Sequence, residues 1–230
     1  PPRGRPDPPN GIPSGAMSTV WLAGGSGLVG GALLRRLLAD ASFDRVVAVG
    51  RRRLALEHPK LSQAIVDFAS PTAFEGLEPP QVAFCCLGTT IQKAGSRDGF
   101  RAVDHDAVLA FARAARGKGA RTFLHVSALG ADPRSLVFYS SVKGQIEESV
   151  ARLGFESVYA LRPSILDGER QESRPGERVG LLVARALGPL LGRYKPTPVE
   201  AVAEAMVALA KAPAPGAHVV DAGAIPNARA

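Results

Sequence analysis

A serine, a tyrosine and a lysine stand at positions from which they could move a proton. Tyr139 and Lys143 lie four residues apart, so they would share one face of a helix. A phenol has a pKa of about 10 and is a poor acid or base at neutral pH, but a neighbouring ammonium favours the phenolate. Ser127 follows an expected strand, where its hydroxyl could bond a substrate oxygen. The three residue types suit general acid–base catalysis.

A Tyr-x-x-x-Lys pair on its own is equally well explained by two residues that share a helix surface by chance. The glycine-rich segment Gly24-Gly25-Ser26-Gly27-Leu28-Val29-Gly30 strengthens the functional interpretation, because it lies between an expected strand and an expected helix. Glycines allow a tight turn, a close approach of a pyrophosphate and close helix packing. The helix N-terminus adds free N–H groups. The segment therefore predicts a dinucleotide-binding loop, and the alternative is a glycine-rich turn without a ligand.

Three arginines, Arg51, Arg52 and Arg53, follow the next expected strand. In many dinucleotide-binding units an acidic residue about 20 residues beyond the loop binds the ribose hydroxyls of NAD. Arginine suits the 2′-phosphate of NADP instead, so NADP(H) is favoured over NAD(H). The alternative is an exposed, solvated basic turn. Asp67, at the end of the third expected strand, could accept a hydrogen bond from the adenine amine or lie free on the surface.

The rest of the sequence supplies the elements that must hold these residues. Apolar spacing predicts strands at 19–23, 45–49, 64–68, 82–87, 122–126, 157–161 and 218–221, and helices at 28–39, 98–118, 139–153, 177–191 and 199–212. This alternation predicts a single α/β domain with a doubly wound parallel sheet, the Rossmann fold. We expect a disordered extension at 1–16, rich in proline and glycine, before a domain at 17–230 whose C-terminal helices form the substrate side.

Composition narrows the function classes. The net charge is +7, but the arginines are spread along the chain without a nucleic-acid-binding pattern, so we expect a small-molecule substrate and no nucleic acid. No apolar run approaches the ~18 residues of a membrane-spanning helix, and the histidines lack the spacing of metal ligands. The adjacent Cys85 and Cys86 indicate a reducing compartment, interpreted as the cytoplasm. Apolar faces of the late helices could be core or interface, which allows a monomer or a homodimer.

The glycine segment together with Ser127, Tyr139 and Lys143 resembles the short-chain dehydrogenase/reductase superfamily, in its extended or atypical branch. The finer resemblance, over nearly everything after Met17, is to the Tat-interacting-protein-like (CC3-like) group of NAD(P)H-binding proteins. It rests on the segments Gly50-Arg51-Arg52, Cys86-Leu87-Gly88-Thr89-Thr90, Val103-Asp104-His105, Phe138-Tyr139 with Lys143-Gly144, Leu161-Arg162-Pro163 and the residues 170–177.

The resemblance implies a set of cofactor contacts: Ser26, Gly27, Leu28, Val29, Arg51, Arg52, Leu87, Gly88, Tyr139, Lys143, Leu166 and Arg174. The chain also departs from the pattern. It has Ser127-Ala128 where relatives often carry two serines, and no asparagine in the middle helix offers a fourth catalytic residue. Asp104 and His105 lie in that neighbourhood and are interpreted as structural or solvated. The short chain argues against a nucleotide-sugar epimerase or dehydratase.

These expectations combine into an NADP(H)-dependent oxidoreductase. It would transfer a hydride to or from a small carbonyl or alcohol substrate, with Tyr139 as acid or base beside Ser127 and Lys143. The alternative is an NADPH-binding regulatory or interaction protein with little or no turnover, because a fold does not settle a function.

Overall fold

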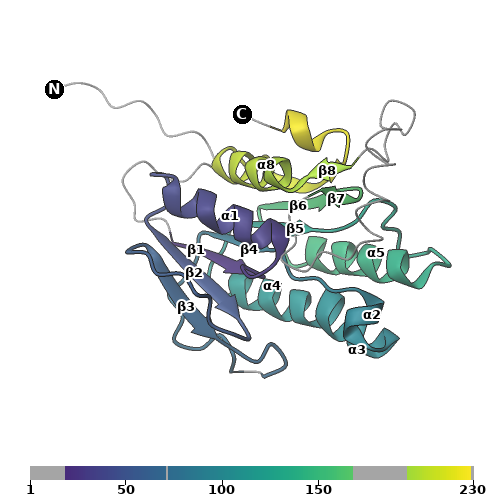
Figure 1. The fold of residues 1–230 in the computed structure, drawn as a ribbon, viewed down its shortest axis with the longest axis horizontal. Helices are drawn as coiled ribbons and strands as arrows, with labels where there is room; N and C mark the ends of the chain where they lie inside the picture. The colour runs from purple at the N-terminus through teal and green to yellow at the C-terminus, as the bar shows by residue number, and fades with distance from the viewer. Residues whose placement is uncertain (1–18, 71, 168–195, 229–230) are drawn as a thin grey trace.

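The computed structural model describes residues 19–70, 72–167 and 196–228. Seven parallel strands form one sheet in the order β3-β2-β1-β4-β5-β6-β9 (Figure 1). Their bounds are Thr19–Ala23 (β1), Arg45–Gly50 (β2), Leu61–Ile65 (β3), Val82–Cys85 (β4), Thr122–Val126 (β5), Ser157–Arg162 (β6) and Gly216–Asp221 (β9). Strand order reverses direction between β1 and β4, where open α/β sheets bind ligands. The expected doubly wound Rossmann fold is confirmed.

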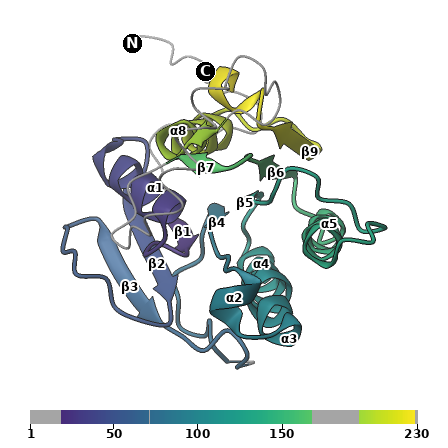
Figure 2. The same cartoon turned by 45° about the vertical axis from the view of Figure 1, so that its right-hand side comes forward.

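Two layers of helices cover the sheet, one on each face (Figures 1 and 2). On one face α1 (Leu28–Ala39) packs beside α8 (Val199–Lys211). On the other lie α4 (Val108–Gly117) and α5 (Phe138–Ala151). The central strands β1 and β4 are buried along their whole length, as expected for parallel strands covered on both faces.

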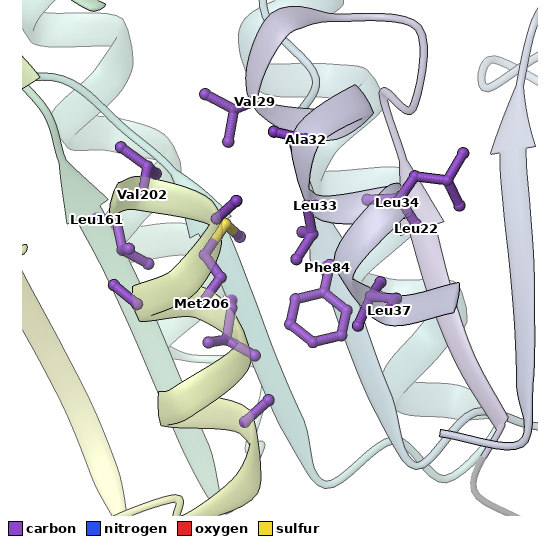
Figure 3. Packing of buried hydrophobic residues seen from close by; sticks show 14 of the residues in the cluster. Leu22, Val29, Ala32, Leu33, Leu34, Leu37, Phe84, Leu161, Val202 and Met206 are labelled. Carbon is purple, nitrogen blue, oxygen red and sulfur yellow. The ribbon is translucent and has the colours of Figure 1, made fainter. Parts of the chain in front are cut away.

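The hydrophobic core between α1, α8 and the sheet fixes the orientation of α1 and therefore the position of its first turn. Leu33 and Leu37 of α1 are fully buried at helical spacing, and Met206 of α8 packs opposite them over Phe84 (Figure 3). Burying a side chain of this size is worth about 1.5–3 kcal/mol. This packing anchors the helix whose N-terminus carries the glycine segment.

The middle helical region is not one regular helix. A short α2 (Ile91–Ala94) precedes α3 (Arg97–Arg101), and a π-helix, η1 (Ala102–Ala107), joins α3 to α4. A π-helical turn holds more residues than an α-helical turn and often occurs at functional sites. Asp104 lies in this π-helix and is 1% exposed.

Several elements differ from the sequence-based expectations. The third strand is Leu61–Ile65 rather than 64–68, because β3 is a half-exposed edge strand with a weak apolar pattern. A small second sheet joins β7 (Leu166–Asp167) to β8 (Thr197–Pro198) and was not expected. The expected helix at 177–191 and the segment 1–16 lie outside the described residues. Within the described ranges, none of the helices has the length and apolar character needed to cross a membrane.

Candidate cofactor and catalytic site

The glycine segment forms a tight turn against the end of β4. Gly24 has φ +84°, and a Cβ there would lie 2.5 Å from the carbonyl carbon of Cys86. The N–H of Gly27 donates to the carbonyl oxygen of Gly24 at 3.0 Å and closes the turn. A Cβ on Gly30 would lie only 2.1 Å from the same oxygen. Positions 24 and 30 therefore need glycine for steric reasons.

The N-terminus of α1 is open at this turn. Gly27 is its N-cap in an extended conformation, and no side chain caps the helix. Ser26 and Gly27 are exposed, Leu28 is half-buried and Val29 is buried. The first N–H groups of a helix and its dipole favour a phosphate. The residues of this turn therefore fit the pyrophosphate of a dinucleotide.

The arginine segment begins where β2 ends at Gly50. Arg51 and Arg52 are exposed, and within the described ranges neither forms an ion pair. Asp67 lies two residues beyond the end of β3, where its Oδ1 accepts the N–H of Ala69 at 3.0 Å. Its carboxylate supports a local turn, and its contact with adenine stays a prediction.

Gly88 lies beside a buried ion pair. A Cβ on Gly88 would stand 3.4 Å from Oδ1 of Asp104 and 3.9 Å from Nζ of Lys143. Leu87, half-buried, joins Gly88 to the end of β4. Because Gly88 has no side chain, a ligand could come close to the ion pair from the edge of the sheet that carries the glycine turn.

The ion pair joins α5 to the π-helix. Nζ of Lys143 lies 2.7 Å from Oδ1 of Asp104, with side-chain exposures of 7% and 1%. The N–H of Thr89 donates to the second carboxylate oxygen at 2.8 Å. Burial has the largest single effect and by itself would lower the pKa of Lys143. Attraction to Asp104 and Tyr139 and the hydrogen bond to Asp104 act together in the opposite direction, and the pKa is raised. The ammonium is therefore held charged inside the protein.

Asp104 is a site residue that the sequence analysis undervalued. Of the two alternatives for Asp104, structural or solvated, the structure excludes the solvated one, because the residue is buried against Lys143. The π-helix turns Asp104 towards the interior, and its sequence has no apolar pattern that would predict this orientation. The only signal in the sequence is its place in Val103-Asp104-His105, one of the segments that carry the family resemblance.

Tyr139 lies in the first turn of α5, one helical turn before Lys143. Its side chain is 36% exposed, and its ring packs against Phe100 with 5.4 Å between centroids. The phenol is therefore supported on one side by the core and is accessible on the other. The expected arrangement of a tyrosine and a lysine on one helix face is present.

Ser127 follows the last residue of β5 at the edge of the sheet. Its N–H donates a hydrogen bond to the carbonyl oxygen of Leu161 on β6 at 2.7 Å. It is buried, and its hydroxyl donates to Oε1 of Glu147. The same carboxylate is held by Nε of Arg162 at 2.9 Å. Glu147 follows Lys143 by one helical turn on α5. Sequence reasoning missed Glu147 as a site residue, although Arg162 lies in a segment that carries the resemblance.

The last two expected contacts fall late in the chain. Leu166 begins β7, is half-buried and pairs with Thr197 of β8. Arg174 lies outside the described residues. The ends of parallel strands meet at one edge of a sheet, so the glycine turn, the arginine segment, Gly88 and Ser127 share the edge where such sheets bind ligands.

No protein-family model matches the chain. Solved structures with the same fold include MoeE5 in complex with UDP-glucose and NAD (TM-score 0.69, 20% identity, 88% of this chain and 75% of that one). Another is WbmH of Bordetella bronchiseptica in complex with NAD+ (TM-score 0.66, 17% identity, 92% of this chain and 78% of that one). A short chain dehydrogenase family protein of Francisella tularensis also matches (TM-score 0.62, 14% identity, 93% and 100%). The shared strand order and the glycine turn define this chain as a protein with the Rossmann fold.

Sequence relatives are more specific. HTATIP2 of Rattus norvegicus is 42% identical over 166 residues, which cover 69% of this chain and 67% of that protein. The mitochondrial protein fmp52 of Emericella nidulans is 39% identical over 186 residues, or 78% and 80% of the two chains. This chain belongs to the family of HTATIP2 and Fmp52 proteins.

The relatives correct the expected cytoplasmic location. Fmp52 proteins of Emericella nidulans and Aspergillus niger are named as mitochondrial, which contradicts that expectation. The expectation was based on the two free cysteines, Cys85 and Cys86. Free thiols indicate a reducing environment and do not distinguish one reducing compartment from another.

Proposed function

We propose that this protein is an NADP(H)-dependent oxidoreductase with a small carbonyl or alcohol as its substrate. The observation that carries the proposal is the buried pair of Lys143 and Asp104, which lies beside Gly88 and one helical turn from Tyr139. A buried ion pair contributes little net stability compared with apolar residues of similar volume. A charged lysine at the ligand-binding edge of the sheet is therefore better explained by chemistry than by folding.

The proton would pass through Tyr139. Its hydroxyl would give a proton to the substrate oxygen during reduction and take one back during oxidation. The ammonium of Lys143 favours the phenolate that this exchange leaves behind. A bound nicotinamide would supply or accept the hydride.

Ser127 would orient the substrate mainly by accepting a hydrogen bond. Its only hydroxyl proton goes to Glu147, so its oxygen is free to accept a hydrogen bond. An alcohol substrate could donate to that oxygen directly. A carbonyl substrate could be bonded by Ser127 only after the serine gives up its bond to Glu147.

The choice of NADP(H) rests on the arginine segment. Arg51 and Arg52 are exposed beyond β2, and neither has an acidic partner within the described ranges. Guanidinium groups bind phosphates through paired, charge-assisted hydrogen bonds. Two solved structures with the same fold contain NAD, which supports a nicotinamide dinucleotide in general.

One observation favours a second candidate, an NADPH-binding regulatory protein with little turnover. Both Lys143 and Ser127 already have a carboxylate partner inside the fold, Asp104 and Glu147. A set that is satisfied internally can serve to bind a cofactor without acting on a substrate.

A binding titration followed by a turnover assay separates the candidates. NADPH binding would be followed by fluorescence, and NADPH oxidation by absorbance with a panel of aldehydes, ketones and quinones. Binding together with turnover supports the oxidoreductase. Binding without turnover across the panel supports the regulatory protein, and absence of binding contradicts both.

A further inference from the structure

The arginine segment is held by one side chain of the neighbouring strand. Gln63 lies in the middle of β3, and its carboxamide oxygen accepts the N–H of Leu54 at 2.8 Å. Its amide nitrogen donates to the carbonyl oxygens of Leu54 at 3.2 Å and of Leu56 at 3.0 Å. The carboxamide thus pairs with both backbone groups of Leu54, as a peptide of an adjacent strand would.

Leu54 in turn contacts the glycine turn. Its side chain is half-buried against the core, and a Cβ on Gly25 would come within 3.2 Å of its Cδ1. At the other end of the segment, the carbonyl oxygen of Gly50 accepts the N–H of Val66 at 2.9 Å. The arginines at 51–53 therefore lie between two fixed points, Gly50 and Leu54.

We propose that Gln63 is a positioning residue for cofactor selectivity. By holding Leu54 and Leu56, it presents Arg51 and Arg52 to the 2′-phosphate of NADPH at the side of the glycine turn. The inference rests on the proposed function, in which these arginines bind that phosphate. Gln63 itself would not touch the cofactor.

The physical reason is preorganisation. A flexible segment that is ordered only when the ligand binds loses conformational entropy at that moment, which weakens binding. The 2′-phosphate is the only group that NADPH has and NADH lacks. Loosening the arginine segment should therefore weaken NADPH binding and spare NADH, whose pyrophosphate the N-terminus of α1 would hold.

The test compares dissociation constants of NADPH and NADH, measured by fluorescence titration. Gln63→Met keeps the length of the side chain but removes all three hydrogen bonds. We expect it to lower the preference for NADPH by about three- to tenfold, the range of a lost hydrogen bond or two. The NADH constant should not change. Ser62→Ala, an exposed neighbour on β3, is the matched control and should alter neither constant.

A second comparison separates this inference from the cofactor assignment. Arg51→Glu should erase the NADPH preference. If it does so while Gln63→Met leaves the preference intact, or weakens both cofactors alike, the role of Gln63 is refuted and the arginine assignment stands. If the unmutated protein binds both cofactors equally, the arginine assignment and the inference both fail.

Folding of each variant would be checked by circular dichroism. Should Gln63→Met not fold, Gln63→Glu provides the second variant, because it retains an acceptor for the N–H of Leu54 and loses both donors. It should also lower the preference for NADPH, and an unchanged preference in that variant would overturn the inference.

Discussion

Nζ of Lys143 lies 2.7 Å from Oδ1 of Asp104, and both side chains are buried. Removing one partner leaves an uncompensated charge in the interior, which costs about 3–5 kcal/mol. Asp104→Ala should lower the free energy of unfolding by that amount, as measured by urea denaturation. The double variant Asp104→Leu, Lys143→Met should lose less than the sum of its single variants, because neither charge remains. Additive losses would show that the two groups do not interact.

Tyr139→Phe should remove turnover and leave cofactor binding nearly intact. The variant keeps the ring that packs against Phe100 and loses only the hydroxyl that exchanges the proton. General acid–base catalysis contributes about 10²–10⁴-fold to a rate, so kcat should fall at least about a hundredfold. Ser140→Ala, the next residue on α5, is the control and should keep the rate. Turnover that survives in Tyr139→Phe would contradict the assignment of Tyr139 as acid or base.

Glu147→Gln should reduce turnover by acting on Ser127. The amide cannot pair as an anion with Arg162, so the hydrogen bond that orients the serine is weakened. A lost charge-assisted bond corresponds to about a ten- to hundredfold change in rate. Glu148→Gln is a matched control, because Glu148 is exposed and pairs only with Arg152 among the described ion pairs.

A double-mutant cycle tests whether Glu147 works through Ser127. In a Ser127→Ala background, Glu147→Gln should have little further effect on kcat. Independent, multiplicative effects of the two substitutions would instead show that the carboxylate acts by another route.

His125 should make the protein sensitive to acid. It is 2% exposed on β5, and burial, followed by repulsion from Lys143 and Arg162, lowers its pKa to about 3. Between pH 6.5 and about 3 the unfolded chain binds a proton that the folded protein excludes. The free energy of unfolding should therefore fall as the pH decreases through this window, by up to roughly 4–5 kcal/mol.

Urea denaturation at several pH values measures this effect. His125→Leu retains an apolar side chain and removes the titrating group, so its stability should depend less on pH over the same window. His218→Leu provides a control, because His218 lies half-buried on the edge strand β9 and not inside the core. Equal slopes for His125→Leu and the unmutated protein would contradict the assignment.

The sequence was most informative for helices and strands whose bounds are set by the spacing of apolar residues along the chain. The bounds of β1, α1 and β5 were predicted to the residue, because strong apolar periods fix them. The third strand was placed too late, since β3 is an edge strand whose exposed residues give little pattern. The π-helix was predicted as part of one regular helix, because its residues show no apolar pattern of their own and its buried residue is Asp104.

Sequence alone determined the glycine turn at Gly24–Gly30 and the helical spacing of Tyr139 and Lys143, because both are local relations of a few residues. Only the tertiary structure revealed what these groups contact. Asp104 reaches Lys143, Glu147 reaches Ser127 and Gln63 reaches Leu54. Each contact joins residues from two different segments of the chain. The distance between these segments depends on the order of the strands in the sheet and on how the helices pack against it. The spacing of residues along the chain does not encode that distance.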